Sequence, residues 1–265
     1  FRAETRKQSG SAEAWFRLGC ALRARHDSAG RKSGDFQQAI RAWTKAIELN
    51  PRNYIFRRRL QQYGPRLDKP YPFYDWIAAA RRDLAARGEE APPLRVALEG
   101  SEIARPSRGG IVEARGEKEP DPKGAIPRDA KGLVAVEAAI APSPARAGSN
   151  AAIYLRFTPN PKRAATWDNE AGPLTVWLKT QNGFKLAKRS LAAAMPDAPS
   201  SSESRSLEFE LGIPRSQEPG EGVLEGYALY YVCEGKSGTC SYLRHDFKVP
   251  VEFRAARQRR GARRR

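Results

Sequence analysis

The feature that most constrains this 265-residue chain is a pair of cysteines separated by a short glycine-containing loop, with strand-like sequence on both sides. An aromatic and aliphatic segment runs from Tyr227 to Cys233, and apolar and polar residues alternate from Cys240 to Phe253. This pattern predicts a β-hairpin with one cysteine on each side of its neck. Facing residues of an antiparallel pair have Cβ atoms about 4.5–5.5 Å apart, which suits a disulfide.

Pairing Cys233 with Cys240 fixes the register of the whole predicted hairpin. The same register aligns two further pairs of residues, Tyr231 with Tyr242 and Tyr227 with Asp246. Side chains alternate between the two faces of a strand, so the cysteines are expected outside the main core. Arg244 is expected on the same face, where its charge could favour a thiolate.

Three chemical states are open for the cysteine pair: a structural disulfide, an exchanging redox couple, or two reduced thiols. Small β domains outside the cytoplasm commonly use disulfides as staples, which favours the first state. Closing a loop of about eight residues stabilises a fold by roughly 2.5 kcal/mol in the chain-entropy treatment. We therefore expect a structural disulfide with a reduction potential below about −300 mV.

The first 90 residues predict helices, because apolar and small residues recur there at helical spacing. This region resembles a tetratricopeptide repeat through seven residues, Trp15, Leu18, Gly19, Ala39, Trp43, Ala46 and Pro51. Trp15 and Ala39 are 24 residues apart, where the repeat expects about 16. Two further helices are expected over residues 54–63 and 73–87.

From residue 131 onward, short alternating segments bounded by turn residues predict about seven strands. The fold class expected is α+β multidomain, with a small tetratricopeptide-like helical domain followed by an antiparallel immunoglobulin-like β-sandwich. The expected boundaries are a helical domain at 1–90, a linker with short strands at 91–130, the sandwich at 131–253 and a disordered arginine-rich tail at 254–265.

The net charge of +17 is unevenly distributed along the chain. Residues 96–253 carry 20 basic and 20 acidic side chains, so the surplus lies in the front and in the tail. No nucleic-acid recognition motif accompanies this charge, and we do not expect a nucleic-acid-binding protein. No apolar run approaches the roughly 18 residues of a membrane span. Because the chain begins at Phe1, we expect a fragment of a longer protein.

The sequence contains no recognisable catalytic constellation. Its two histidines, His26 and His245, fall in different predicted domains, and no phosphate loop or zinc motif is present. A metal ion at the cysteine pair would need two further ligands, and Cys20 is expected to be a buried small side chain, so no metal and no cofactor are expected. The segment 167–170 either contacts a carbohydrate or peptide or, as we favour, is a loop whose Trp167 caps the core.

The cysteine hairpin resembles the amino-terminal domain of DsbD, the periplasmic thiol:disulfide interchange protein. In that family an immunoglobulin-like domain presents a redox-active cysteine pair to periplasmic partners, so the resemblance implies that Cys233 and Cys240 exchange. Segments 57–71 and 167–170 look like parts of carboxyl-terminal extensions of bacterial thioredoxin-like (redoxin) proteins that contain tetratricopeptide repeats. This second resemblance implies a preceding thioredoxin-fold domain and a periplasmic location.

The function expected from the sequence is that of a non-enzymatic accessory region of an exported thioredoxin-like protein. Its partners would be proteins, with a thioredoxin-fold domain foremost. The alternative is an electron-transfer module in which Cys233 and Cys240 exchange with a partner. Non-specific binding of nucleic acid through the basic segments is the third and least favoured hypothesis.

Overall fold

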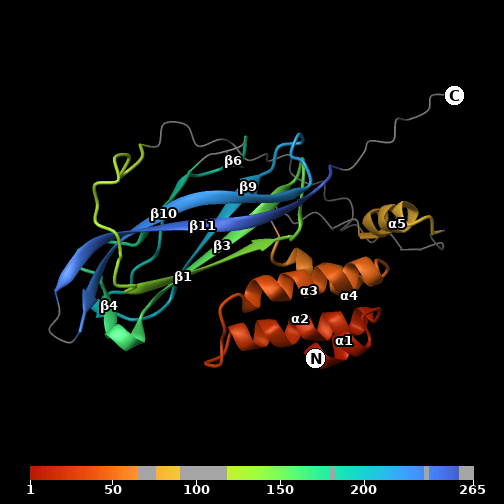
Figure 1. The fold of residues 1–265 in the computed structure, drawn as a ribbon, viewed down its shortest axis with the longest axis horizontal. Coiled ribbons are helices and arrows are strands. Elements are labelled where there is room, and N and C mark those ends of the chain that lie inside the picture. The colour runs from red at the N-terminus through yellow and green to blue at the C-terminus, as the bar shows by residue number, and fades with distance from the viewer. Residues whose placement is uncertain (65–75, 90–117, 180–182, 236–238, 257–265) are drawn as a thin grey trace. The chain divides into compact units, whose positions relative to one another are not determined.

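The computed structural model describes residues 1–64, 76–89, 118–179, 183–235 and 239–256 (Figure 1). The chain divides into an N-terminal unit, which extends to Gly110, and a C-terminal unit, which begins at Ile111. The three residues Ala141–Ser143 group with the first unit. Parts of three expectations fall outside the described residues: residues 91–117 of the linker at 91–130, residues 257–265 of the tail at 254–265, and residues 73–75 of the helix at 73–87.

The described part of the N-terminal unit is helical. Its elements are α1 (Arg2–Lys7), α2 (Ala12–His26), α3 (Asp35–Leu49), α4 (Tyr54–Gln61) and α5 (Trp76–Ala86). Helix α2 begins after Ser11, whose side chain accepts a hydrogen bond from the Ala14 amide, and α4 begins after Asn53, which caps two amides in the same way. Helix α3 follows Gly34, whose φ of 77° is left-handed and suits glycine.

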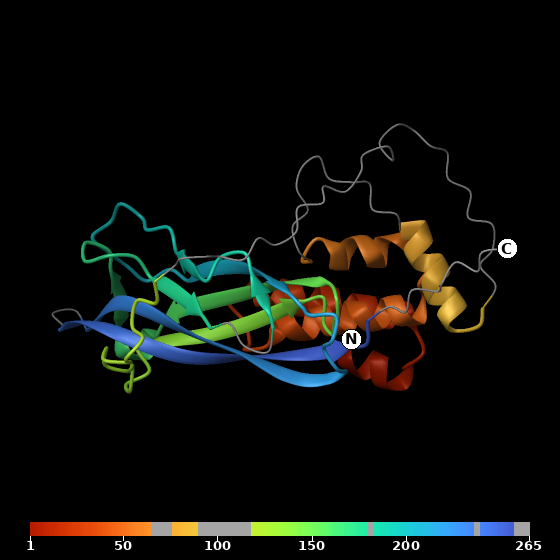
Figure 2. The same cartoon turned by 90° about the horizontal axis from the view of Figure 1, so that it is seen from above.

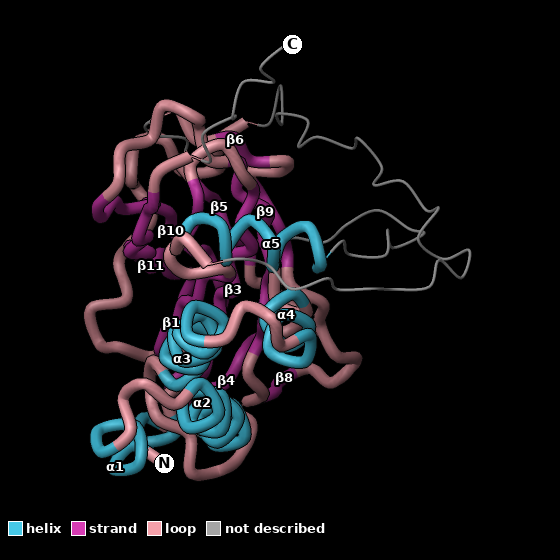
Figure 3. Tube along the Cα trace, turned by 90° about the vertical axis from the view of Figure 1, so that its right-hand side faces the viewer, coloured by secondary structure: helices cyan, strands magenta, loops and turns pink. Residues whose placement is uncertain are grey.

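Helices α2 and α3 lie side by side and form a hairpin (Figures 1 and 3). Gly19 allows their close approach, because a Cβ at this position would come within 2.4 Å of Trp43 Nε1. Trp43 is buried and stacks on Tyr63, with ring centroids 5.5 Å apart. The small and large residues that produced the repeat-like pattern therefore pack one helix against another.

The predicted fold class is wrong. Strands account for 36% of the structure, and the described helices do not form a tetratricopeptide repeat domain. The repeat prediction fails because the hairpin of α2 and α3 is not repeated. Helix α4 has only 8 residues, and no second helical hairpin stacks on α2 and α3 within the described residues. Gly19 and Trp43 specify one helix–helix contact, which a single hairpin satisfies without repetition.

The C-terminal unit contains two sheets. The first has the strand order β1 (Val134–Ala141), β3 (Asn150–Pro159), β9 (Arg205–Gly212) and β6 (Lys185–Leu186). The second has the order β2 (Ala145–Arg146), β11 (Cys240–Arg254), β10 (Gly220–Glu234), β4 (Ala165–Asp168) and β8 (Ser200–Ser201), while β5 (Thr175–Leu178) joins β10 to β7 (Ser190–Ala192). A short 3-10 turn over Pro161–Arg163 precedes β4.

The two sheets share one hydrophobic core. Inward-facing residues of β3 and β9, such as Ile153 and Phe209, belong to the same buried cluster as Trp167, Tyr230 and Val251 from the second sheet. These positions follow the period of two that a strand with one buried face requires. The strand pattern therefore produces a pair of sheets around a common core.

The hairpin of β10 and β11 is the longest feature of the second sheet (Figure 2). Its ladder is continuous from Gly220↔Phe253 to Cys233↔Cys240. It contains both of the further pairs predicted from the cysteines, Tyr231 with Tyr242 and Tyr227 with Asp246. The predicted register of the hairpin is confirmed.

Residues 118–130, within the segment predicted as a linker, pack on the outer face of this hairpin, and we call them the strap. Ile126 packs against the side chains of Trp177, Tyr227 and Leu229, which form a small second apolar cluster. The backbone of the strap pairs with β11, since the Arg244 amide donates to the Pro127 carbonyl over 2.8 Å. The outer face of the sheet is thus partly covered by chain that precedes the first strand.

Candidate functional site

The candidate site is the end of the β10/β11 hairpin where Cys233 and Cys240 form a disulfide. The two residues face each other across the ladder, and Cys233 is also paired with Thr166 of β4 on its other side. The disulfide lies outside the main core, as predicted, because the alternate residue Val232 is the one that points into the core cluster. Cys240 is exposed and Cys233 is half-buried.

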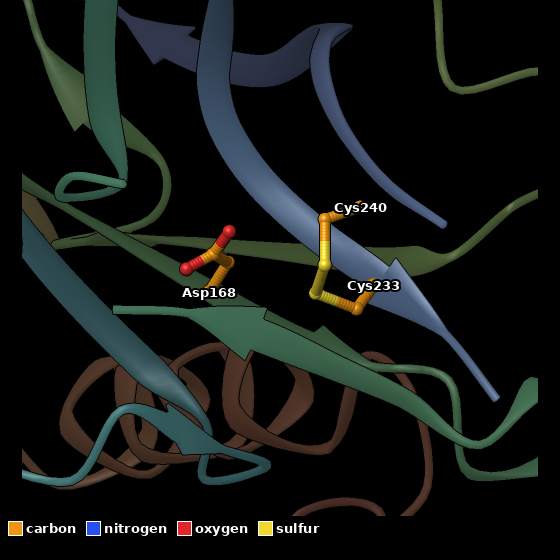
Figure 4. Close-up of side chains that lie close together, drawn as sticks. All are labelled: Asp168, Cys233 and Cys240. Carbon is orange, nitrogen blue, oxygen red and sulfur yellow. A yellow bond between two sulfur atoms is a disulfide. The ribbon is translucent and has the colours of Figure 1, made fainter. Parts of the chain in front are cut away.

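The carboxylate of Asp168 lies beside the disulfide (Figure 4). One of its oxygens and the two sulfur atoms all lie within 4.8 Å of one another. Asp168 is two residues after Thr166 on β4 and therefore points to the same face of the sheet as the cysteines. Its Oδ1 accepts a hydrogen bond of 3.2 Å from the Ala171 amide, which orients the carboxylate.

A pair of tyrosines lies next to the cysteines on the ladder. Tyr231 and Tyr242 are directly opposite, and their rings stack with centroids 4.4 Å apart and an interplanar angle of 25°. Tyr242 is 37% exposed, and Tyr231 is partly covered. Partial burial, together with the neighbouring Tyr231, raises the pKa of Tyr242. The disulfide, the tyrosine pair and Asp168 together form what we call the disulfide face.

Arg244 lies on the same face but is not available to a thiolate. It is 5% exposed, and it donates to the Asp121 carboxylate and to Asp246 Oδ1, each over 2.8 Å. Its guanidinium also lies over the ring of Tyr227, 3.7 Å from the centroid. Burial opposes ionisation of Asp121, but hydrogen bonds from Arg244 and from two strap amides outweigh it and lower the pKa of this carboxyl group. Arg244 therefore anchors the strap.

A second polar cluster lies on the core side of β10, around Asp129 near the end of the strap. The hydroxyl of Tyr230 donates to Asp129 Oδ2 over 2.9 Å and is 3.3 Å from His245 Nδ1. Burial and the neighbouring Asp129 raise the pKa of Tyr230, and burial lowers the pKa of His245. Asp129 also accepts hydrogen bonds from the Leu133 and Val134 amides, so this cluster fixes the start of β1. We assign it a structural role.

The sequence-predicted site residues fall into two separate groups. Cys233 and Cys240 meet, as described. The seven repeat-like residues pack within the helical unit and contribute no polar site: six of them, Leu18, Gly19, Ala39, Trp43, Ala46 and Pro51, are buried, and Trp15 is half-buried.

Trp167 is fully buried in the core, as favoured, although it lies in strand β4 rather than in a loop. Its Nε1 donates to the Glu203 carbonyl over 2.8 Å.

Asp168 and Asp121 were not assigned to the site from the sequence. The alternation of Ala165, Thr166, Trp167 and Asp168 could have revealed β4 as a strand with one buried face. No sequence signal places β4 beside β10, because that pairing joins segments more than 60 residues apart. Among the described residues, no helix is long and apolar enough to cross a membrane.

Comparison with known proteins leaves the family of this chain open. No family model and no curated protein matches it. A Porphyromonas gingivalis protein of unknown function covers 46% of this chain and 48% of its own length, with 14% identity and a TM-score of 0.28. The match to AvmM, described as catalysing macrocyclization in alchivemycin A biosynthesis, covers 49% of this chain and 92% of AvmM, with 9% identity and a TM-score of 0.25. The match to the neutral ceramidase of Pseudomonas aeruginosa covers 91% of this chain and 36% of the ceramidase, with 11% identity and a TM-score of 0.21. These likenesses carry no functional argument.

Proposed function

We propose that this chain is a non-enzymatic protein-binding region that contacts a thioredoxin-fold partner through the disulfide face. The observation that carries the proposal is the exposed ring of Tyr242, which is stacked on Tyr231 beside the disulfide. Tyrosine offers a large, rigid apolar surface with a polar tip, and it is enriched at protein interfaces. The long ladder and its terminal cross-link hold this surface in one conformation, which reduces the entropic cost of binding.

The test is the affinity of the full chain for a purified thioredoxin-fold protein, measured by calorimetry with Tyr242→Ala as the variant. An interface anchor lost on truncation should raise Kd about tenfold, which corresponds to about 1.4 kcal/mol. Tyr54→Ala is the matched control, because Tyr54 is similarly exposed, at 39%, but lies on α4. The proposal fails if the unaltered chain does not bind, or if both variants bind with the same Kd.

A second candidate, thiol–disulfide exchange, is favoured by the unequal exposure of the two cysteines. Cys240 is exposed, so a partner thiolate can attack its Sγ, break the S–S bond and displace Cys233 as a thiolate. A second thiolate of the partner then attacks the mixed disulfide and releases Cys240. The partner leaves as a disulfide, and this chain keeps two reduced cysteines, each of which takes up a proton.

The reduction potential of the Cys233–Cys240 pair separates the two candidates. A value below about −300 mV marks a structural disulfide, and a value near −200 mV marks an exchanging one. In the exchange case, Cys233→Ala should trap a mixed disulfide at Cys240 with a single-cysteine thioredoxin-fold protein whose cysteine has first been activated with thionitrobenzoate, because the Cys240 thiolate attacks that activated sulfur and displaces thionitrobenzoate. Cys240→Ala should trap much less, because Cys233 is half-buried. Equal trapping by both variants would argue against attack at Cys240.

A further inference from the structure

Three side chains with metal-ligating atoms converge on the disulfide face. Asp168, Cys233 and Cys240 come from three neighbouring strands, β4, β10 and β11. Because β10 pairs with both of the other strands, the backbone sets the spacing of these side chains independently of any ligand. No more than 4.8 Å separates any two of the three ligand atoms (Figure 4).

We propose that reduction of the disulfide turns this cluster into a binding site for a thiophilic divalent cation such as zinc. The two cysteine thiolates and the Asp168 carboxylate would be its protein ligands. Zinc binds thiolate sulfur at about 2.3 Å and carboxylate oxygen at about 2.0–2.2 Å, so two sulfurs on one tetrahedral ion lie roughly 3.8 Å apart. Once the S–S bond is broken, rotation of the two side chains can provide this separation.

The position of Asp168 supports a ligand role. One of its oxygens is oriented by the Ala171 amide, and hydrogen-bonded support of this kind is typical of metal-ligating carboxylates. The expectation of no metal site rested on the hairpin supplying only two ligands, and β4 supplies the third. Because Cys240 is exposed, water can occupy the fourth coordination position.

The chemistry balances with a dithiol as the reductant. The dithiol gives up two electrons and becomes a disulfide, while Cys233 and Cys240 become two thiols. Binding of the cation then forms two metal–sulfur bonds and releases two protons to solvent. The oxidised chain lacks two of the three ligands, so occupancy of the site would report the redox state of the hairpin.

The test is a zinc titration of the full chain carrying Cys20→Ala, which removes the third cysteine. The chain is reduced with a dithiol, freed of it without oxygen, and titrated in competition with a chromogenic chelator. We expect one zinc per reduced chain and at least tenfold weaker binding after oxidation. Asp168→Asn should weaken binding at least tenfold. Glu170→Gln, an exposed acid two residues away, should leave it unchanged.

Cobalt provides a second readout, because two thiolate ligands produce a sulfur-to-metal charge-transfer band that Cys240→Ser should weaken. The proposal is overturned if the oxidised chain binds zinc as tightly, if Asp168→Asn binds like the parent, or if no zinc binds. If reduction alone unfolds the β unit, zinc must restore the circular dichroism spectrum of the reduced parent chain. Zinc must not restore the spectrum of the reduced Asp168→Asn variant. These titrations contain no protein partner, so they are independent of the proposed role of Tyr242.

Discussion

At the residue scale, Arg244 explains how a charge can lie on a covered face of the second sheet. Burying a guanidinium is costly unless its charge is compensated, and two carboxylates and an aromatic ring provide the compensation. Asp121 is the buried partner and Asp246 the exposed one, with side chains that are 5% and 45% exposed. The two acids should therefore differ in their contribution to stability.

We expect Asp121→Asn to lower the free energy of unfolding by about 3 kcal/mol at neutral pH, because it leaves Arg244 buried with only its exposed partner. Asp246→Asn is the control and should cost less than about 1 kcal/mol. The pKa of Asp121 is lowered in the folded chain, so its contribution is present above its ordinary pKa and is lost as pH falls through the folded value. Urea unfolding of both variants at several pH values is the measurement. A constant difference between Asp121→Asn and the parent down to low pH would contradict this assignment.

At the element scale, the sequence predicted those features that depend on neighbouring residues. The register of the hairpin follows from alternation and from the two cysteines, and the presence of helices α2 and α3 follows from apolar and small residues at helical spacing. The number of stacked helical hairpins does not follow from such local patterns, and the repeat-domain prediction failed for this reason. The position of β4, and with it Asp168, depends on pairing between distant segments, which alternation within one segment cannot specify.

Gly226 offers a direct test of the close packing of β10 against β5. A Cβ at this position would lie 2.7 Å from the Trp177 carbonyl oxygen and 2.9 Å from Phe247 Cζ. Gly226→Ala should therefore destabilise the β unit by about 1–3 kcal/mol, since the backbone of β5 cannot move aside without breaking its ladder. Thermal unfolding followed by circular dichroism measures the effect.

Gly222→Ala is the matched control on the same strand. The three atoms nearest to the added Cβ all belong to the side chain of Phe253 and none to the backbone, so we expect a smaller loss of stability than at Gly226. Equal losses for the two variants would show that the close approach of β5 to β10 is not what requires glycine.

At the scale of the whole molecule, the strap connects the outer face of the hairpin to the start of the first sheet. Asp121 accepts hydrogen bonds from Arg244, and Ile126 covers the small apolar cluster. Asp129 accepts a hydrogen bond from the Tyr230 hydroxyl and another from the first amide of β1. Residues 118–130 thus contribute to stability from outside the strands. A domain boundary at residue 131, as predicted from composition, would remove all of these contacts.

We predict that replacing residues 118–130 in the full chain with a glycine–serine segment of equal length will destabilise the β unit by more than Asp121→Asn alone. The replacement removes the buried partner of Arg244, the apolar cover over Trp177 and the Asp129 cap together, and neighbouring contacts of this kind need not add. Tryptophan fluorescence should shift to longer wavelength as Trp177, now 4% exposed, meets water. An unchanged unfolding midpoint with unchanged fluorescence would mean that residues 118–130 only connect the two units. A lower midpoint that leaves the Cys233–Cys240 reduction potential unaltered would show that the strap stabilises the fold without affecting the disulfide.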